Sequence, residues 1–522
     1  MLPSVLVAAL QDLQMPGRRV FNRKPKSPSS EEPAAGLRAL GDRRLILVSN
    51  REPYARRRGA DGVRFERTAG GLVTALDPVM RGSGGVWIAW QPEAEAQMES
   101  RFLVPAEAPQ FTLRQVPLTK REVARYYLGF ANRALWPLFH YFLDRCRFDE
   151  GEWQQYVQVN ERFAEAAAEE AKPGDVVWVH DYHFCLLPQM IRERRRGEGP
   201  IAFFLHIPFP PEEVFRILPW RRQVLSGLLG ADLVGFHTPE YAGDFLGCCE
   251  RLLGAEVDHR RGIVRWQKRE VRVGAFPIGI DVAEFAEAAA EPAAAERAVR
   301  IRQSIGAGAP HLILGVDRLD YSKGIVERLQ AIDVLLEQHP ELRRKLVFLQ
   351  VAVPSRTQVK EYGELKRQID ELVGRINGKH GTPRWQPIRY LYRSVPRQEL
   401  VALYRAADIC LVTPLRDGMN LVAMEFAACR QDGGGVLVLS EFTGASQQLG
   451  KGAVLVNPFA IHETAETLAA VLAMSEEERR ERMAELQSRV AECDVHSWLG
   501  NVLAAALGQD GKPRLRSRGG AA

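Results

Sequence analysis

The chain has 522 residues, of which 46% are hydrophobic and 26% charged, and its net charge is +5. This composition excludes a disordered, fibrous or collagen-like chain, and the length favours two large domains. Residues 1–43 carry a net charge of +3 and residues 511–522 one of +4, which leaves about −2 for residues 44–510. The basic excess therefore belongs to the two ends, and a protein that coats nucleic acid is not expected.

Residues 1–43 are rich in Pro, Ser and charge. They predict a flexible basic tail, and ordered structure is expected to start at Arg44. The segment after Arg51 predicts a β-hairpin with its turn at Asp61-Gly62. Buried strands separated by helical patterns follow. The predicted strands are 44–50, 176–180, 201–206 and 231–236, and the predicted helices are 155–171, 184–196 and 211–217.

The same alternation restarts near residue 311. The predicted strands are 311–318, 345–353, 389–392, 409–413, 435–440 and 453–457, and the predicted helices are 324–338, 358–376, 397–406 and 418–429. Such alternation is typical of βαβ units with a parallel sheet. We therefore expect an α/β protein with a first doubly wound domain at 44–280 and a second at 281–474. A helical segment at 475–510, with its helix ending near 507, and a basic tail at 511–522 would follow.

Standard catalytic signatures are absent: the sequence has no GxGxxG fingerprint, no phosphate-binding P-loop and no GxSxG elbow. His180 and His183 form an HxxH pair without further zinc ligands, so an ordinary strand-end cluster is the better interpretation. Loops at the carboxyl ends of parallel strands usually build the site, here in a cleft between the two domains.

Polar residues follow several predicted strands of the first half. Arg51 follows the first strand, Asp181 the second and His206 the third. A histidine at a strand end is more often a hydrogen-bonding residue than a catalyst. Gly70-Gly71 opens an apolar helix, where bare backbone could approach a phosphate or a sugar. A plain turn with a helix cap explains the same pair.

In the second half, Arg318 and Lys323 lie on either side of a tight loop before a helix, and Arg356 follows the next strand. Two cations beside a helix N-terminus suit a diphosphate, although solvated surface charges would show the same pattern. Asp417 opens a turn before another helix, and Glu425 lies two turns along it. Glu425 could accept the hydroxyls of a ribose or could be an exposed helix residue.

Taken together, eight segments in order resemble the trehalose-6-phosphate synthase family of retaining glycosyltransferases. They span almost all of 44–500 and are SNR (49–51), GG (70–71), YYLGFANRALWPLFHY (126–141), VWVHDYH (177–183), FFLHIPFP (203–210), DRLDYSKG (317–324), GRINGKHG (374–381) and TPLRDGMNLVAMEF (413–426). The resemblance implies the GT-B fold, with two Rossmann-like domains facing a central cleft. The first would bind the acceptor and the second the nucleotide sugar.

The resemblance also implies transfer of glucose from UDP-glucose to glucose 6-phosphate, giving trehalose 6-phosphate and UDP. The residues implied in catalysis are Arg318, Lys323, His206 and Asp181. Those implied in acceptor binding are Arg51, Tyr127, Trp136, Asp181 and Arg356. Those implied in donor binding are Gly71, Arg318, Lys323, Val395, Asp417, Gly418, Met419, Asn420, Leu421, Val422, Ala423, Met424 and Glu425. No metal and no cofactor are implied, since UDP-glucose is a substrate.

Three features leave the acceptor open. The segment after Arg51 is longer than in short bacterial members, its REPY wording resembles glucosylglycerol-phosphate synthase, and Met424 stands where Lys is common. The alternative acceptor is glycerol 3-phosphate, and the nucleotide could be UDP, GDP or ADP. A non-catalytic sugar-phosphate sensor is a further alternative, but the charged site residues that such a protein would lose are all present.

Location and partners follow from what the sequence lacks. No apolar run approaches the 18 or so residues of a membrane span, and the first residues lack the positive charge of a signal peptide. The seven cysteines show no CxxC spacing, which suits reduced thiols. We expect a cytoplasmic enzyme with small-molecule substrates, no nucleic acid, no membrane and no fused phosphatase domain. A homo-oligomer is left open, because no interface is visible in the sequence.

Overall fold

The structure is a computed structural model that describes residues 35–59, 62–67, 71–92, 100–105, 110–195, 199–305 and 311–509. Within these residues the strands form a large sheet, a smaller sheet and a separate hairpin. Strands up to residue 275 belong to the large sheet or the hairpin, and strands from residue 311 onward belong to the smaller sheet. Most of the two predicted tails, 1–34 and 510–522, lies outside the described residues.

The large sheet is parallel in its centre. Its described strands run in the order β10-β11-β12-β9-β8-β7-β1-β4-β6-β5. Among the described strands of this sheet, the antiparallel pairs are β10–β11, β11–β12 and β5–β6, and the other pairs are parallel. The strands are β1 (Leu45–Val48), β4 (Val86–Pro92), β5 (Arg101–Val104), β6 (Phe111–Leu118), β7 (Val176–His180), β8 (Ile201–Phe204), β9 (Leu233–Phe236), β10 (Glu256–Asp258), β11 (Ile263–Trp266) and β12 (Arg269–Ala275).

The smaller sheet is parallel throughout and runs β15-β14-β13-β16-β17-β18. This is the strand order of a dinucleotide-binding Rossmann fold. Its strands are β13 (His311–Arg318), β14 (Leu346–Val353), β15 (Ile388–Leu391), β16 (Ile409–Val412), β17 (Val436–Ser440) and β18 (Val454–Val456). All six lie where the apolar runs predicted strands.

Helices of the first half follow most strands. They are α1 (Ala35–Leu40), α2 (Gly71–Ser83), α3 (Lys120–Val123), η2 (Ala124–Leu135), α4 (Trp136–Phe139), η3 (Leu143–Arg145), α5 (Glu150–Glu170), η4 (Tyr182–Phe184), α6 (Leu187–Arg195), α7 (Glu212–Phe215), α8 (Arg221–Leu228), α9 (Pro239–Cys248) and η5 (Cys249–Leu253). Helix α5 begins five residues before its predicted start, because the Asp149 carboxylate accepts the Glu152 N–H and caps it.

Helices of the second half are α10 (Val282–Ala290), α11 (Pro292–Ser304), η6 (Tyr321–Lys323), α12 (Ile325–Gln338), η7 (Pro340–Leu342), α13 (Lys360–His380), α14 (Arg397–Ala406), α15 (Leu421–Cys429), α16 (Gly444–Leu449), α17 (Ile461–Leu472), α18 (Glu476–Glu492) and α19 (Val495–Ala506). Helices α12, α13, α14 and α15 lie within a few residues of the four predicted helices, and the other helices had no separately predicted range. Helix α14 has the predicted limits. Helix α15 begins later than predicted, because Asn420 has a φ of 81° and lies outside the helix.

The predicted hairpin is present, but Gly62, which was predicted in its turn, is the first residue of its second strand. Strands β2 (Tyr54–Gly59) and β3 (Gly62–Arg67) pair antiparallel with Gly59 opposite Gly62. Ala60 and Asp61, which connect them, lie outside the described residues. A two-residue connection is the shortest common hairpin loop.

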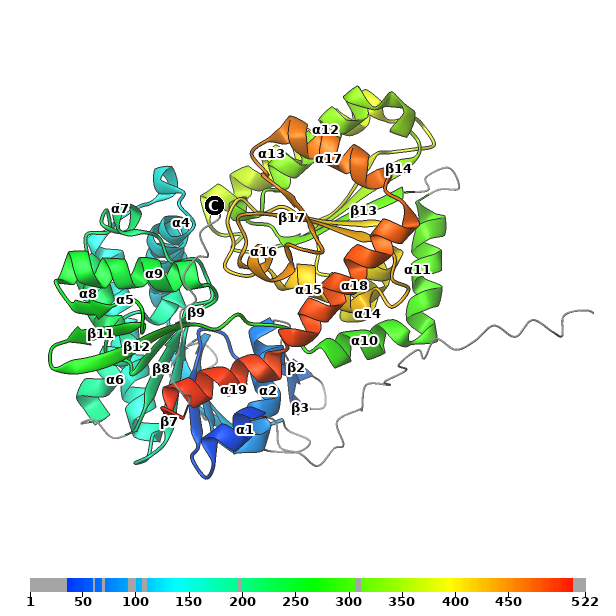
Figure 1. The fold of residues 1–522 in the computed structure, drawn as a ribbon. Coiled ribbons are helices and arrows are strands. Elements are labelled where there is room, and N and C mark those ends of the chain that lie inside the picture. Colours follow the sequence, from blue (N-terminus) through cyan, green and yellow to red (C-terminus); the bar gives the residue numbers. More distant parts are fainter. Residues whose placement is uncertain are drawn as a thin grey trace, which may run out of the picture. The chain divides into compact units, whose positions relative to one another are not determined.

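Two expectations about the ends of the chain differ from the structure. Ordered structure begins before Arg44, because α1 packs against α19 and the Gln509 side chain donates to the Ala39 carbonyl at 3.3 Å. The last helical segment is two helices, because α18 ends with its C-cap at Cys493 and the Asp494 carboxylate caps the start of α19. Figure 1 shows α19 in red beside α1 in blue, while α18 packs against α15 and α16 of the smaller sheet.

Strands β4, β5, β6, β10, β11 and β12 were not predicted. β6 alternates buried and partly exposed residues, but it includes Pro117, Arg114 and Gln115, so its sequence predicts a strand only weakly.

The helical region after β6 is also unusual. Helix η2 has π-type hydrogen bonding and a non-helical Gly129 in its middle. It carries Tyr127 and ends at Trp136, both predicted site residues, and π-type segments are frequent at functional sites.

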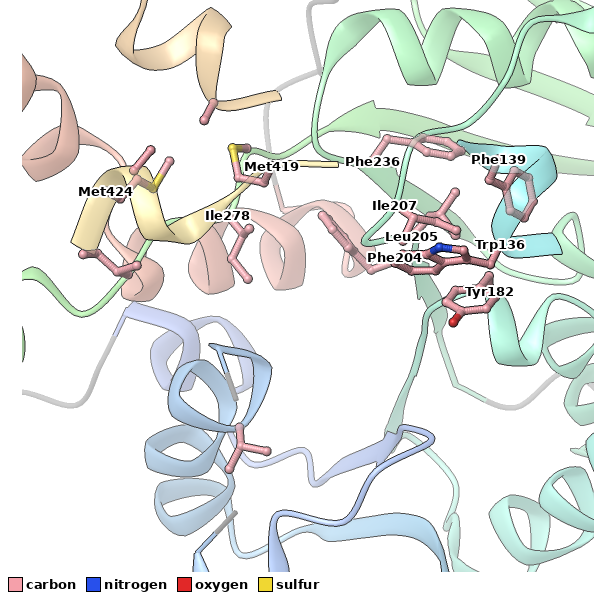
Figure 2. Close-up of a cluster of buried hydrophobic side chains, with 14 of the residues drawn as sticks. Trp136, Phe139, Tyr182, Phe204, Leu205, Ile207, Phe236, Ile278, Met419 and Met424 are labelled. Atoms are coloured by element: carbon pink, nitrogen blue, oxygen red, sulfur yellow. The ribbon is translucent and has the colours of Figure 1, made fainter. Parts of the chain in front are cut away.

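The core continues into the loops at the carboxyl ends of β7 and β8. Trp136 is 3% exposed, and its ring centroid lies 5.6 Å from that of Tyr182. Figure 2 shows both rings in a cluster with Leu205 and Ile207. Site aromatics are therefore fixed by the core. None of the helices among the described residues has the length and apolarity needed to cross a membrane.

Candidate active site

The predicted site residues gather where the strand order of each sheet reverses. In the large sheet β1 pairs with β7, and Arg51 and Asp181 follow these two strands. In the smaller sheet β13 pairs with β16, and Arg318, Lys323 and Asp417 lie at or after them. Neighbouring strands whose connections leave in opposite directions open a crevice at their carboxyl ends. The topology thus brings together residues that are far apart in the sequence.

Arg356 comes from the smaller sheet and reaches residues of the large one. Its Nη2 donates to the Tyr182 hydroxyl at 3.1 Å, and its guanidinium carbon lies 4.0 Å above the centre of the Trp136 ring. The side chain is 3% exposed, and the backbone has a φ of 46°. A non-glycine residue in this region carries strain, which persists where the surroundings fix it. Arg356 is therefore held in one position.

Arg51 and Tyr127 belong to the same cluster. Burial alone would raise the pKa of the Tyr127 phenol, but the charges and hydrogen bonds of Arg356 and Arg51 lower that pKa below its usual value. Arg51 is exposed, and its carbonyl accepts from Ser49 Oγ at 2.7 Å. Four of the five predicted acceptor residues, Arg51, Tyr127, Trp136 and Arg356, thus form one group with two cations, as an anion would require.

Two residues that sequence reasoning missed hold Arg356. Asp320, fully buried, accepts from Arg356 Nη1 at 2.8 Å and from the Tyr362 hydroxyl at 2.9 Å. Burial would raise the pKa of Asp320, but Arg356 and neighbouring cations lower it to about 2. Asp320 lies in the DRLDYSKG segment, so its position was a usable signal. Tyr362 on α13 looks like an ordinary core aromatic in the sequence.

Arg318 and Lys323 differ in their surroundings. Within the described residues, Arg318 makes no hydrogen bond or ion pair, and its guanidinium lies 5.6 Å from the Trp136 ring centre. Lys323 Nζ is 2.5 Å from Asp417 Oδ2, and both side chains are largely buried. Arg318 is half-buried, and a partly desolvated cation without a counterion favours the binding of an anion beside it. Arg318 is the group best placed to receive one.

Arg328, which is 1% exposed, holds the backbone of Lys323 in place. Arg328 donates to Asp317 at 2.6 Å, to Gln350 at 2.9 Å and to the Lys323 carbonyl at 3.2 Å. This network fixes the backbone of η6, from which the lysine extends. Arg328 and Asp317 neutralise one another, so they add no net charge to the site.

The loop that begins at Asp417 contacts the large sheet. The Asp417 carboxylate accepts from the Gly418 N–H at 3.0 Å and from Asn420 Nδ2 at 3.1 Å. A Cβ added at Gly418 would lie 2.2 Å from the His206 carbonyl oxygen, so only glycine fits there. The predicted donor loop and His206 are therefore in direct backbone contact.

The rest of the predicted donor segment is on α15. Met419, Ala423 and Met424 are buried in the core, so these side chains face the protein, whereas Leu421 and Val422 are half-buried. Glu425 Oε2 accepts from the Tyr404 hydroxyl at 2.7 Å, and burial raises the pKa of Glu425. Tyr404 was not predicted as a neighbour.

Val395 and Gly71 are described only in part. Val395 is half-buried in the loop before α14. Gly71 is the first residue of α2, and Gly70 lies outside the described residues. Among the described residues, no hydrogen bond or ion pair joins the side chain of Val395 or the backbone of Gly71 to the other predicted site residues. Their roles remain predictions.

Asp181 and His206 form the centre of the large-sheet side. Asp181 has a φ of 75°, and its carboxylate accepts from the N–H groups of Tyr182 at 3.0 Å and His206 at 3.3 Å. Burial raises the pKa of Asp181 to about 6 despite these hydrogen bonds. Burial also lowers the pKa of His206 well below its usual value, and His180 and His237 lower it further. At neutral pH the site therefore has an ionised carboxylate beside an uncharged imidazole.

Arg416 is a further residue that sequence reasoning missed. Its guanidinium lies 3.7 Å from the centre of the Tyr141 ring and donates to the Tyr141 hydroxyl at 2.8 Å. The neighbouring Asp417 carbonyl accepts from the Tyr241 hydroxyl at 3.0 Å. Two tyrosines of the large-sheet half thus hold the donor loop of the smaller-sheet half. Arg416 stands inside a quoted motif, but its partners could not be found from sequence.

The HxxH pair does not form part of a metal site in the described chain. His183 stacks on Tyr127 with 5.6 Å between ring centroids, and neither of its nitrogens has a partner. No group of three or more His, Cys, Asp or Glu side chains suited to a metal occurs among the described residues.

Comparison with known proteins identifies the family. The model of glycosyltransferase family 20 matches residues 43–507. The chain belongs to glycosyltransferase family 20. This family 20 chain is 45% identical over 476 residues to the trehalose-6-phosphate synthase of Mycolicibacterium vanbaalenii, covering 89% of this chain and 96% of that protein. It is 44% identical to a bifunctional trehalose-6-phosphate synthase/phosphatase of Thermoproteus tenax, covering 87% of this chain but only 62% of that protein.

Solved structures of family 20 members share the fold. An alpha,alpha-trehalose-phosphate synthase (UDP-forming) of Burkholderia xenovorans, in complex with glucose-6-phosphate, is 35% identical with a TM-score of 0.80 over 89% of this chain and 100% of its own. The trehalose-6-phosphate enzyme of E. coli bound with UDP-2-fluoro glucose is 34% identical with the same TM-score over 89% of this chain and 98% of its own. The predicted GT-B fold is confirmed. The roles of single residues remain predictions.

Proposed function

We propose that this family 20 chain transfers glucose from UDP-glucose to glucose 6-phosphate with retention, giving alpha,alpha-trehalose 6-phosphate and UDP. The observation that carries the proposal is the pairing of two anion sites. Arg51, Tyr127 and Arg356 form one beside Trp136, and Arg318 with Lys323 forms the other. An acceptor phosphate and a donor diphosphate would occupy them. The two solved relatives described above support this assignment, since one is in complex with glucose-6-phosphate and the other is bound with UDP-2-fluoro glucose.

The chemistry follows from where negative charge develops. The bond between glucose C1 and the diphosphate oxygen breaks, the acceptor oxygen bonds to C1 from the same face, and the acceptor proton passes to the leaving phosphate. Arg318 and Lys323 stabilise that leaving group, and preorganised charge of this kind is usually the largest catalytic contribution. Lys323 must exchange its Asp417 partner for the phosphate, which frees the Asp417 carboxylate for glucose hydroxyls. Asp181, ionised at neutral pH, accepts from acceptor hydroxyls.

The function is tested by product analysis. Purified protein with UDP-glucose and glucose 6-phosphate should release UDP and form a non-reducing disaccharide phosphate, with both anomeric carbons in the α configuration by NMR. Glycerol 3-phosphate in place of glucose 6-phosphate tests the alternative acceptor, and ADP-glucose and GDP-glucose test the nucleotide. If UDP is released from UDP-glucose with glycerol 3-phosphate but not with glucose 6-phosphate, the proposed acceptor is refuted.

We also propose that the transfer needs no metal, because Arg318 and Lys323 supply the positive charge that a metal provides in other transferases. UDP release should then be unchanged by EDTA and by added Mg²⁺.

A cytoplasmic location is part of the proposal, and the seven cysteines, all free in the structure, support it. The oligomeric state would be measured by sedimentation.

A further inference from the structure

The predicted site residue His206 is stacked on a second histidine, His180. His180 ends β7, and His206 follows β8 by two residues. In the pairing of β7 with β8, His180 lies opposite Phe204. The rings of His180 and His206 are stacked, with 5.3 Å between their centroids and an angle of 19° between their planes. His180 Nδ1 lies 3.0 Å from His206 Nε2, within hydrogen-bond distance. His180 is fully buried, whereas His206 keeps part of its surface exposed beside the donor loop.

Both rings are neutral at pH 7, because burial lowers the pKa of His180 to about 3 and that of His206 well below its usual value. A neutral imidazole carries one N–H and one acceptor nitrogen. A single hydrogen therefore lies between His180 Nδ1 and His206 Nε2, and its donor fixes both tautomers. If His180 donates, both rings are protonated at Nδ1. If His206 donates, both are protonated at Nε2.

The surroundings of His180 distinguish the two arrangements. Its Nε2 is buried and has no partner. The Trp178 ring lies against it at 4.6 Å between centroids. When His206 donates, this nitrogen must carry an N–H that is buried without an acceptor. When His180 donates, the same nitrogen carries only a lone pair. Among backbone groups, orphaned buried N–H donors are rarer than under-satisfied acceptors, and the same preference applied to the imidazole favours donation by His180.

We propose that His180 is a positioning residue that donates its Nδ1 hydrogen to His206 Nε2 and so fixes His206 with its own hydrogen on Nδ1, as the donor offered to a hydroxyl of the transferred glucose. The ligand contact rests on the proposed function, whereas the tautomer does not. His206 Nε2 is occupied by His180, so Nδ1 is the nitrogen left for the substrate. The sugar oxygen must then act as acceptor, which is a requirement on how glucose lies in the site.

The tautomer is measured directly by long-range ¹H–¹⁵N correlation on protein labelled at histidine, with signals assigned from His180→Asn and His206→Asn proteins. We expect His206 to show a protonated Nδ1 and an unprotonated Nε2 at pH 7. A protonated Nε2, or a fast average of both tautomers, would overturn the proposal. This measurement needs no substrate, so it is independent of whether the proposed reaction occurs.

Activity tests the positioning role. An Asn amide nitrogen occupies the place of histidine Nδ1, so His180→Asn keeps the donor, and His180→Leu removes it at similar volume. We expect His180→Asn to retain most of kcat/KM for UDP-glucose and His180→Leu to lose it about tenfold or more, with Tm matched between the two. By the same geometry His206→Asn should retain more activity than His206→Gln, whose amide mimics Nε2.

Two activity results would contradict the proposal: equal activity of His180→Leu and His180→Asn at matched Tm, or greater activity of His206→Gln than of His206→Asn. If UDP-glucose is not turned over at all, binding of UDP-glucose by calorimetry replaces kcat/KM in the same comparison. A chain that binds no UDP-glucose refutes the proposed function and the ligand contact together, while the NMR result still decides the role of His180 in fixing the tautomer.

Discussion

At the scale of single residues, the arginines of the site fall into two kinds. Arg328 is fully buried and satisfied by Asp317, Gln350 and Thr413. Arg318 has no hydrogen bond or ion pair among the described residues. Burial with complete pairing identifies a structural residue, whereas a cation with nothing to neutralise it awaits a ligand. The sequence shows both as charged residues near one strand and cannot separate them.

Substitution should separate them. Arg318→Gln removes a charge and a 5.6 Å contact with the Trp136 ring, but no hydrogen bond or ion pair among the described residues, so we expect the free energy of unfolding to change by no more than about 0.5 kcal/mol. Its kcat/KM should fall by about 10²–10³-fold. Arg328→Gln is the matched control and should lose about 3–5 kcal/mol of stability, because it leaves buried Asp317 unpaired. Denaturant titration and UDP release measure both. An active Arg318→Gln enzyme would contradict the assignment.

Asp181 gives a pH prediction. Its pKa is raised to about 6 by burial. If the carboxylate accepts acceptor hydroxyls, kcat/KM for glucose 6-phosphate should fall as pH drops through about 6, where Asp181 is protonated. Asp181→Asn should lower activity at every pH and abolish this limb of the profile. A limb that persists in Asp181→Asn would assign it to another group.

The same shift predicts a stability effect of opposite sense. The pKa of Asp181 is higher in the folded chain than the ordinary value of about 3.9. Ionised Asp181 therefore destabilises the fold increasingly as pH rises from about 4 to 6. Asp181→Asn keeps an acceptor oxygen without charge. It should raise Tm relative to the parent chain at pH 8 and have little effect at pH 4, and an equal effect at both would argue against this cause.

At the scale of elements, the donor loop is held by tyrosines of the other half of the chain. Tyr241 donates to the Asp417 carbonyl, and Tyr141 accepts from Arg416. Tyr241→Phe deletes one hydroxyl and should raise KM for UDP-glucose several-fold, with KM for glucose 6-phosphate unchanged. Tyr390→Phe is the control, because the Tyr390 hydroxyl is buried without a partner. Equal KM values in the two variants would show that the hydrogen bond does not position the loop.

The elements themselves were largely predictable where local pattern decides them. The strands of the smaller sheet are almost entirely apolar runs such as LVFLQVAV. Helix α14 begins after Pro396 and ends before Ala407. Contacts across the fold were not predictable. Asp320 and Tyr362 meet Arg356 only through tertiary structure, and β6 is stabilised by its place beside β4 despite Pro117. The quoted motifs predicted which residues enter the site, but not that Asp417 would neutralise Lys323.

At the scale of the whole molecule, the chain passes between its two sheets at two adjoining places. Ile280 and Asp494 form an isolated parallel bridge, and the Val495 N–H donates to the Ile280 carbonyl at 3.1 Å. A Cβ on Gly279 would lie 1.3 Å from the Cys493 carbonyl oxygen. The two connecting segments are therefore packed backbone to backbone. A sequence pattern alone could place neither segment beside the other.

Helix α19 makes the last part of the chain essential to the first. Trp498 is 2% exposed and packs on Trp178 at 5.3 Å and on Phe204 at 5.2 Å between ring centroids. Trp498→Ala should lose about 3–5 kcal/mol. Val299→Ala, at a position that is 56% exposed, should have almost no effect. Chemical denaturation measures both, and a stable Trp498→Ala protein would show that α19 is dispensable.

The return of α19 to the large sheet also sets an order on biosynthesis. Domains generally fold as units, the first one beginning while the rest is still being made. Here the large sheet is finished at Ala275, yet the side of it that Trp498 covers stays bare until the entire smaller sheet has left the ribosome. During that interval the nascent chain presents Trp178 and Phe204 to chaperones. A chain released before α19 is made would keep this apolar surface permanently and be a substrate for aggregation or proteolysis.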